Sequence, residues 1–391
     1  MEASDAIHLE RALDLARNAK GCTSPNPLVG AVVVKNGRVL GEGWHAGPGC
    51  DHAEIAAIKD ALRRRRGTVP PAGSSLDLPS VRSVCAKATM YVTLEPCCTV
   101  GRTPPCTTTL LGGGFARVVV GAIDPSPTVN GRGVQLLRAA GMRVEIAEGI
   151  LAHRARRQND GLRKTVTRGV PFVTYKYAMS IDGRVATDSG ESCWISSPES
   201  RKLVHRWRAW SDAVVVGTGT LAHDNPRLTA RGVECASQPL RVVVGRRPNL
   251  SLEATLVRSV AEGPVLAIVG EDFGNDARRS LESWGIDTVA VGQGASGQLD
   301  PTEVCRTLAA RGVQTVLLEG GSRIAGAWWN AGVIDRIAAF VCRRVLSGAE
   351  LRGPLLGSGA ADVQGGIELQ EVEIVQVGPD VLMSGYREGP F

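Results

Sequence analysis

The chain has 391 residues, of which 43% are hydrophobic and 21% charged, an ordinary globular composition with enough apolar residues for two or three domains. The formal net charge of +6 is mild for this length and aromatic residues make up only 4%, so the sequence shows neither the basic stripe nor the stacking surface of a nucleic-acid-binding protein. The ten cysteines are not arranged like a disulfide scaffold, and with neither a signal peptide nor an apolar run of ~18 residues we expect a soluble, cytoplasmic protein that does not bind membranes.

Strand and helix patterns alternate over residues 1–150 and predict an α/β layered domain. Asn36-Gly37 joins two strand patterns, and this dipeptide favours the two-residue turn of a β-hairpin. Residues 67–88 begin with a stretch rich in Gly, Pro and Ser, which we interpret as a surface insertion. The predicted helices are 6–18, 52–65 and 134–140, and the predicted strands are 30–35, 38–41, 90–94, 117–123 and 142–147.

A polar and basic segment at 151–170 predicts a helical connector, and a second α/β pattern follows over 171–391. The two halves do not resemble each other, so the sequence predicts two different α/β domains. In the second domain, strands are predicted at 172–178, 213–217, 241–245, 265–269, 288–291, 315–319 and 336–341. Helices are predicted at 199–208, 276–284, 301–310 and 324–331.

Three short motifs of the first domain carry its chemistry: the HAE run at 52–54, the EPC run at 95–97, and Cys106. One imidazole and two thiolates leave the fourth corner of a tetrahedral zinc ion open for a water, whose pKa zinc lowers towards ~7. Glu54 is close enough to His52 to move a proton without being a ligand, as in the H-x-E and P-C-x-x-C signature of zinc deaminases. The pattern therefore predicts hydrolytic deamination of a nucleobase-like ring.

Two other interpretations use the same residues. Cys98 competes with Cys97 as a ligand, although Cys97 is preferred because it directly follows Glu95 and Pro96. If Cys98 supplied a fourth ligand, the site would be closed and the domain would be a zinc-stabilised scaffold. A nucleic-acid-editing deaminase shares the zinc chemistry, but it requires a basic groove that the modest charge does not suggest.

The loop between the thiols is longer than in short deaminase motifs, because residues 98–105 separate Cys97 from Cys106. This loop, which ends in GRTPPC, is similar to that of the bifunctional riboflavin-biosynthesis deaminase/reductase family. The runs SPNP at 24–27, GWH at 43–45 and DPSPTVNGRG at 124–133 also resemble that family. The resemblance implies zinc on His52, Cys97 and Cys106, Glu54 as proton shuttle, and substrate contacts from Asn26, His45, Arg102 and Thr103.

Two positions depart from the family pattern. Cys98-Thr99 stand where the family usually has Ser-His, and Ser126 replaces the asparagine of its Asp-Pro-Asn-Pro run. An imidazole is thus missing beside the zinc loop, which leaves open a single-activity protein whose deaminase has decayed.

The resemblance continues from Pro171, in KYAMSIDG at 176–183, SGES at 189–192, TGTLAHDNPRLTAR at 218–231 and LEGG at 318–321. It implies a reductase domain similar in fold to dihydrofolate reductase. The implied cofactor contacts are Ala178, Trp194, Thr220, Asp224, Gly321, Ser322, Arg323, Ile324, Ala325, Gly326 and Ala327. The implied substrate contacts are Ser192, Arg208, Leu228, Arg231 and Glu319.

The residues of the second domain fit these implied roles. A glycine turn before a helix lets backbone N–H groups approach a phosphate, although a plain strand-to-helix turn fits the LEGG segment equally. The G-x-G-x-x-G run at 292–297 is a false positive, because no helix begins directly after it. Arg208 and Arg231 suit a 5′-phosphate, since guanidinium binds phosphate in a bidentate fork. Arg246 stands where relatives have serine, and we predict that it pairs with a 2′-phosphate and favours NADPH.

The resemblance therefore implies a zinc- and NADPH-dependent enzyme that acts on a phosphorylated pyrimidine and not on nucleic acid. The substrate would be a diamino-ribosylamino-pyrimidinone 5′-phosphate, deaminated in the first domain. The second domain would then transfer hydride from nicotinamide C4 to ribose C1′, largely by positioning the two carbons. Because such enzymes are usually assemblies, a homo-oligomer is also expected.

Overall fold

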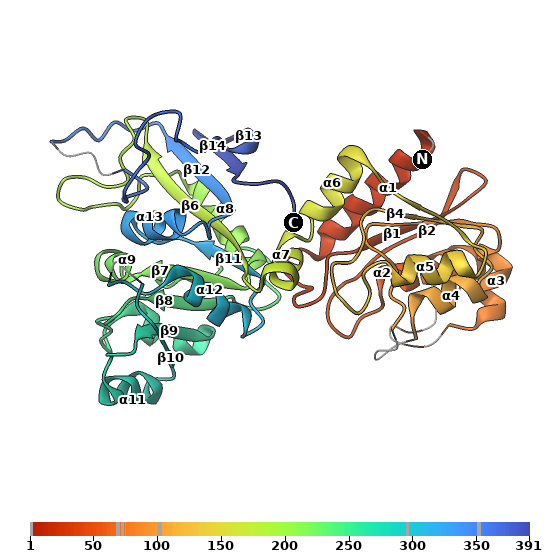
Figure 1. Cartoon of the computed structure of the whole chain (residues 1–391), viewed down its shortest axis with the longest axis horizontal. Coiled ribbons are helices and arrows are strands. Elements are labelled where there is room, and N and C mark those ends of the chain that lie inside the picture. The colour runs from red at the N-terminus through yellow and green to blue at the C-terminus, as the bar shows by residue number, and fades with distance from the viewer. Residues whose placement is uncertain are drawn as a thin grey trace. The chain divides into compact units, whose positions relative to one another are not determined.

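The computed structural model describes residues 3–67, 71, 74, 76–99, 104–294, 297–349 and 353–391. The chain forms two compact units, Met1–Arg168 with Pro390–Phe391, and Gly169–Gly389 (Figure 1). Within the described ranges, no helix combines the length and the hydropathy that a membrane span requires.

The first unit is built on a mixed sheet with the strand order β2-β1-β3-β4-β5. β1 runs antiparallel to β2 and β3, whereas β3, β4 and β5 are parallel. The strands are β1 (Gly30–Lys35), β2 (Arg38–Trp44), β3 (Thr89–Val92), β4 (Arg117–Val120) and β5 (Arg143–Ile146). The helices are α1 (Ala3–Ala16), α2 (Ala53–Arg66), α3 (Leu78–Cys85), α4 (Cys106–Gly112), α5 (Arg132–Ala139), α6 (Gly149–Arg157) and α7 (Asp160–Arg168).

Helices cover both faces of this sheet, because the side chains of each strand alternate between two apolar clusters. On one face, Val32 and Val119 pack with α1 and α6. On the other face, Val33 and Val118 pack with α2, α3, α4 and α5. The result is the α/β/α layered domain that the alternating pattern predicted.

Two segments contribute more to the core of the first unit than the sequence predicted, although the helices predicted for the second of them are confirmed. The second half of the predicted surface insertion, 67–88, contains α3, whose Val81 and Cys85 are buried in the core. The predicted connector, 151–170, is largely α6 and α7, and Leu151 and Ala155 pack against α1. The Gly- and Pro-rich start of the first segment and the basic residues of the second concealed these few apolar anchors.

A pair of glycines sets how closely α2 approaches the sheet. A Cβ added to Gly41 would lie 2.3 Å from the Ala57 carbonyl oxygen, and one added to Gly43 would lie 2.3 Å from the Ala57 nitrogen. Only glycine fits at these two positions of β2, so the backbone of α2 lies directly against the strand.

The second unit is built on a sheet with the strand order β10-β9-β8-β7-β11-β6-β12-β14-β13. From β10 to β12 neighbouring strands are parallel, and β14 and β13 are added antiparallel at one edge. The strands are β6 (Phe172–Ser180), β7 (Ala213–Gly217), β8 (Leu240–Val244), β9 (Val265–Gly270), β10 (Asp287–Val291), β11 (Thr315–Leu318), β12 (Arg336–Cys342), β13 (Gln370–Val377) and β14 (Asp380–Tyr386).

Helices again cover both faces of the sheet. The helices are α8 (Pro198–Trp210), α9 (Thr218–Asp224), α10 (Thr255–Arg258), α11 (Asn275–Ser283), α12 (Pro301–Ala309) and α13 (Ser322–Asn330). α12 and α13 pack on one face around Leu308 and Trp328. α9, α10 and α11 pack on the other around Leu221, Leu256 and Leu281.

The sequence prediction omitted the terminal hairpin, β13 and β14. β13 reads QEVEIVQV, an alternating strand pattern, but its residues are mostly exposed rather than buried on one face. The prediction relied on buried apolar runs, and this edge strand has none.

Candidate functional sites

In the first unit, one imidazole and two thiols lie close together. The candidate donor atoms of His52, Cys97 and Cys106 all lie within 4.8 Å of one another. The His52 Nδ1 atom is 3.5 Å from Cys97 Sγ and 3.4 Å from Cys106 Sγ. The structure thus brings together the three residues that the sequence motifs singled out, from three separate segments.

Local structure places each donor. His52 is the residue directly before α2, Cys97 follows β3, and Cys106 is the first residue of α4. The backbone N–H of Cys106 donates to Cys97 Sγ at 3.3 Å, so the N-terminus of α4 points at that sulfur. Hydrogen bonds from Cys106 and His52 outweigh burial and lower the pKa of Cys97 to about 4. This lowered pKa favours the thiolate form of Cys97, which is the form that binds metal.

Among the described residues, the donor group has these three members, and Cys98 is not one of them. Three protein ligands with an open position are typical of catalytic zinc sites, whereas structural sites use four. The donor set of one nitrogen and two sulfurs also suits zinc. The geometry therefore favours a catalytic zinc site over the closed scaffold that a Cys98 ligand would give.

Glu54 lies on the first turn of α2 and is buried beside the donors. Burial, followed by the negative charge of Cys97, raises the pKa of Glu54 to about 7 before any metal charge acts on it. A carboxyl group with a pKa near the working pH can both accept and return a proton.

Asn26 and His45 adjoin this group. Asn26 Nδ2 lies 3.0 Å from His45 Nε2, and the His45 ring meets the His52 ring edge-on at 5.7 Å between centroids. Burial lowers the pKa of His45, so the imidazole is neutral near pH 7. The predicted contacts Arg102 and Thr103 lie outside the described residues.

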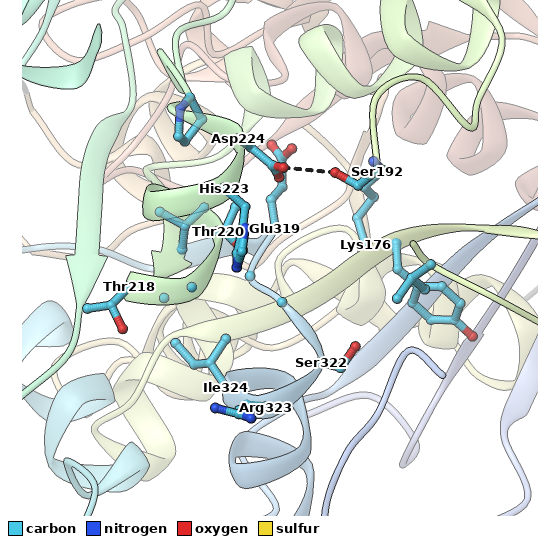
Figure 2. Close-up of a pocket in the computed structure, with 18 of the residues that line it drawn as sticks. Lys176, Ser192, Thr218, Thr220, His223, Asp224, Glu319, Ser322, Arg323 and Ile324 are labelled. Atoms are coloured by element: carbon cyan, nitrogen blue, oxygen red, sulfur yellow. Dashed lines mark hydrogen bonds between the residues drawn. The ribbon is translucent and has the colours of Figure 1, made fainter. Parts of the chain in front are cut away.

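In the second unit, a cavity of about 1080 Å³ lies at the carboxyl ends of β7, β8 and β11 (Figure 2). Ligands of parallel α/β sheets bind at this edge, and the volume exceeds that of an ordinary small-molecule site. Residues predicted from the sequence that line it are Ala178, Ser192, Trp194, Arg208, Thr220, Asp224, Leu228, Arg231, Arg246, Glu319, Gly321, Ser322, Arg323, Ile324 and Ala327.

A buried ion pair lies in this cavity. Arg208 donates from Nε and Nη2 to the two carboxylate oxygens of Glu319, at 2.6 and 2.9 Å. Burial opposes both charges, but each partner outweighs it, so the pKa of Glu319 is lowered and that of Arg208 raised. The pair is charged, and it uses two of the Arg208 donors that were predicted to bind a 5′-phosphate.

Figure 2 also shows Lys176 of β6 among the lining residues, together with the hydrogen bond of 2.8 Å that Ser192 Oγ donates to Asp224. Burial lowers the pKa of Lys176, although Glu319 partly opposes this shift. Lys176 was not among the site residues predicted from the sequence. Its charge within the strand pattern of 172–178 was the one feature of the sequence that could have indicated a role in the site.

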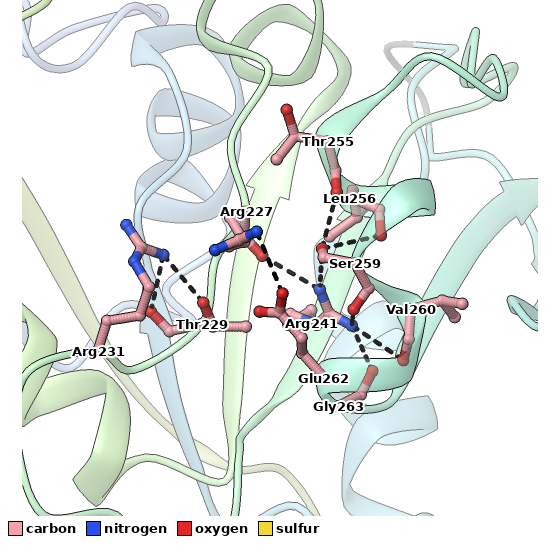
Figure 3. Close-up of polar contacts among 10 residues, drawn as sticks. All are labelled: Arg227, Thr229, Arg231, Arg241, Thr255, Leu256, Ser259, Val260, Glu262 and Gly263. Carbon is pink, nitrogen blue, oxygen red and sulfur yellow. Dashed lines mark hydrogen bonds and ion pairs between the residues drawn. The ribbon is translucent and has the colours of Figure 1, made fainter.

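The segment 227–231, which carries two of the lining residues, also contacts Arg241, which does not line the cavity. Arg241 is fully buried and donates to the carbonyl oxygens of Arg227, Ser259 and Gly263, among others (Figure 3). On the cavity side, the Thr229 carbonyl accepts a hydrogen bond from Arg208. The segment is therefore fixed between Arg241 and the Arg208–Glu319 pair.

Comparison with known proteins agrees with this architecture. Residues 2–122 match the cytidine and deoxycytidylate deaminase zinc-binding region, and residues 171–383 match the RibD C-terminal domain. The chain is 35% identical to the riboflavin biosynthesis protein RibD of Synechocystis sp. over 387 residues, covering 99% of this chain and 97% of the relative. The chain belongs to the RibD family. It is 32% identical to the RibD of Escherichia coli, with 97% of this chain and 98% of that one covered.

Solved RibD structures support the same assignment. Acinetobacter baumannii RibD matches with a TM-score of 0.81 and 31% identity, covering 98% of both chains. A Thermotoga maritima deaminase/reductase matches with a TM-score of 0.76 and 29% identity over 98% of both chains. The chain is therefore an enzyme of riboflavin biosynthesis with deaminase and reductase activities, as the sequence resemblance implied.

The structure places two predicted cofactor contacts of this RibD family member away from the cavity. Ala325 and Gly326 are not among the lining residues, and Ala325 is fully buried in the core. A Cβ on Gly326 would lie 1.8 Å from the Leu356 carbonyl oxygen. The prediction took the whole first part of α13, but only one side of a helix can face a ligand.

Arg246 lines the cavity but already has a partner. Its Nε and Nη2 atoms lie 2.9 and 2.8 Å from Asp272 Oδ2, which also accepts from Arg247. Two guanidinium groups share one carboxylate, so the cluster keeps a net positive charge at the cavity edge. Binding of a 2′-phosphate there remains a prediction.

Proposed function

We propose that the first unit deaminates 2,5-diamino-6-ribosylamino-4(3H)-pyrimidinone 5′-phosphate and that the second unit reduces the ribosyl group of the product with NADPH. The names of both activities belong to the Thermotoga maritima relative, diaminohydroxyphosphoribosylaminopyrimidine deaminase/5-amino-6-(5-phosphoribosylamino)uracil reductase. The single observation that carries the proposal is the group of His52, Cys97, Cys106 and the buried Glu54 in a chain that matches RibD proteins along its length.

For the first reaction, His52, Cys97 and Cys106 would hold a zinc ion. Zinc would lower the pKa of a bound water and so supply the nucleophile at neutral pH. Glu54 takes one proton from the attacking water and delivers it to the ring nitrogen as the new C–O bond forms. It then carries the second proton, from the hydroxyl that has added to the ring carbon, to the amine, so that the C–N bond breaks, ammonia leaves and the carbonyl forms. Asn26 and His45 bind the pyrimidine or the ribose, and Arg102 and Thr103 bind the phosphate.

For the second reaction, NADPH would supply a hydride from nicotinamide C4 to ribose C1′, the bond between C1′ and the ribose ring oxygen would break, and one proton from solvent would complete the open ribityl chain. The chain contributes mostly position, because hydride transfer requires two carbons held close and aligned. The N-terminus of α13, at Ser322, offers backbone N–H groups to an anionic part of the cofactor. The substrate contacts Ser192, Leu228, Arg231 and the Arg208–Glu319 pair. Arg246 favours binding of NADPH over NADH.

The alternatives are less well supported. A decayed single-activity protein does not account for an intact donor group in one unit and a large lined cavity in the other. A nucleic-acid-editing deaminase does not account for the second unit. The predicted homo-oligomer is supported by exposed apolar side chains on the terminal hairpin, at Val372, Ile374, Val375, Val381 and Met383. The cytoplasmic location stays a prediction.

One assay tests both halves. Ammonia release and NADPH consumption are followed separately on the diamino pyrimidine substrate, with the Glu54→Gln variant as control. We expect the wild-type chain to release ammonia without NADPH, and Glu54→Gln to lower that rate by about 10²–10⁴-fold, the usual contribution of general acid–base catalysis. The variant should still consume NADPH when given the deaminated pyrimidine. If Glu54→Gln releases ammonia at the wild-type rate, the deaminase assignment is wrong.

A further inference from the structure

Lys59 is a buried lysine of the first unit, on the second turn of α2, and neither proposed reaction uses it. Its ammonium group donates to Asp51 Oδ1 and Oδ2 at 3.1 and 2.9 Å, and to the Pro71 carbonyl oxygen at 2.7 Å. The side chains of Lys59 and Asp51 are only 5% and 12% exposed. An ammonium group has three protons, so all of its donors are used, and the pair is held in one geometry.

Asp51 connects this ion pair to the candidate zinc site. It directly precedes His52, the residue before α2. Its backbone carbonyl oxygen lies 3.0 Å from Nδ1 of His45. Lys59 therefore fixes the side chain of Asp51, and the main chain of Asp51 contacts His45.

The contacts of His45 determine its tautomer. A carbonyl oxygen can only accept, so Nδ1 of His45 must carry the proton that it shares with Asp51. In a neutral imidazole the other nitrogen is then an acceptor. Nε2 thus accepts from the Asn26 amide nitrogen, 3.0 Å away. This orients the Asn26 amide, with its second N–H and its carbonyl oxygen left for a ligand.

We propose that Lys59 is a positioning residue of the deaminase unit: its buried ion pair with Asp51 holds His45 as the Nδ1–H tautomer and thereby orients the Asn26 amide for the pyrimidine. This inference rests on the proposed deaminase function. A pyrimidinone presents neighbouring carbonyl and ring N–H groups, and an amide of fixed orientation complements such a donor–acceptor pair.

The test combines kinetics with a spectroscopic readout on the zinc-loaded full chain. The Lys59→Met variant keeps the length of the side chain and removes its charge. We expect KM for the pyrimidine substrate to rise about tenfold, the effect of losing one well-aligned hydrogen bond, while kcat changes much less. Long-range ¹H–¹⁵N spectra of histidine-labelled protein, with His45→Gln to assign the signal, should show the Nδ1–H tautomer in the wild type and its loss in the variant.

Two further variants keep the result interpretable. Lys59→Met removes the lysine that pairs with the largely buried Asp51 carboxylate, and this loss can destabilise the fold. The Asp51→Asn/Lys59→Met double variant therefore removes both charges and keeps the main-chain carbonyl. We expect the same loss of tautomer in the double variant. Lys20→Met, at an exposed lysine of the same unit, is the matched control and should leave KM and the spectrum unchanged.

The outcomes separate this inference from the proposed function. If the Lys59 variants keep both the His45 tautomer and the wild-type KM, or if they lose zinc in proportion to activity, Lys59 does not act through His45 and the proposal is overturned. If the wild-type chain releases no ammonia, or if Glu54→Gln has no effect, the deaminase function itself fails. The zinc content of each variant is measured alongside the rates.

Discussion

The candidate zinc site and the cavity of the second unit are built in opposite ways. The zinc site consists of a few side chains that lie close together, the buried Cys106 and Glu54 and the partly buried His52 and Cys97. The cavity is wide, and its lining comes from strand ends, helix starts and loops far apart in the sequence. A compact site can be recognised from short motifs, whereas a wide cavity is defined only once the fold has placed its walls.

Removal of metal from the purified protein with a chelator should separate the two sites most clearly. We expect ammonia release to fall by about 10⁴-fold, because several kcal/mol of transition-state stabilisation come from a zinc-type ion. NADPH consumption with the deaminated pyrimidine as substrate should stay within about twofold of the untreated rate. The two rates are measured on the same sample, and activity is restored by adding zinc.

The control for this prediction is the Cys98→Ala variant, which should keep its zinc and its ammonia release. If chelation also abolishes the reductase, the two sites are not independent as described. If Cys98→Ala loses zinc, Cys98 is a ligand after all and the site is closed rather than open.

The next largest expected effect is a loss of stability when the Arg208–Glu319 ion pair is broken. The side chains of Arg208 and Glu319 are 13% and 10% exposed, so Arg208→Met leaves a carboxylate buried without its partner. The free energy of unfolding of the second unit should fall by about 3–5 kcal/mol. Urea unfolding followed by tryptophan fluorescence measures it, since Trp44 is the only tryptophan outside that unit.

The matched variant for this pair is Arg208→Met/Glu319→Gln, which removes both charges and should recover part of the loss. Because the folded pKa of Glu319 is lowered, the pair stabilises the fold above the ordinary glutamate pKa and this contribution disappears as the pH falls through the folded value. A cost below about 1 kcal/mol for Arg208→Met, as for an exposed pair, would contradict this account.

The same contrast explains what the sequence could and could not predict. The ligand residues were found because zinc chemistry demands particular residue types in a particular order. The strands were found because buried strands of parallel sheets are continuous apolar runs. Both rules act over short stretches of sequence.

Residues that act through tertiary contacts gave no such signal. Lys59 looks like an ordinary helix lysine, and only the fold shows that its charge lies buried against Asp51. The sequence predicts Arg241 only as the first residue of a strand, yet its guanidinium donates to the Arg227 carbonyl oxygen and so contacts the segment 227–231. Ala325 and Gly326 were assigned to the cofactor because motif matching does not tell which side of α13 faces the cavity.

The smallest expected effect concerns Arg246, at the edge of the cavity. Arg246→Ala removes a half-exposed guanidinium that shares Asp272 with Arg247. We expect KM for NADPH to rise by about tenfold and KM for NADH to change little, since only NADPH carries the 2′-phosphate and a charge-assisted hydrogen bond at an exposed site contributes at the low end of its range. Steady-state kinetics with both cofactors measure the ratio, and Arg279→Ala, an exposed arginine on α11 paired with Asp276, is the control. Equal effects on the two cofactors would assign Arg246 to the surface rather than to the cofactor. The Arg246–Asp272 pair would then be an ordinary solvated ion pair, and other lining residues would have to distinguish NADPH from NADH.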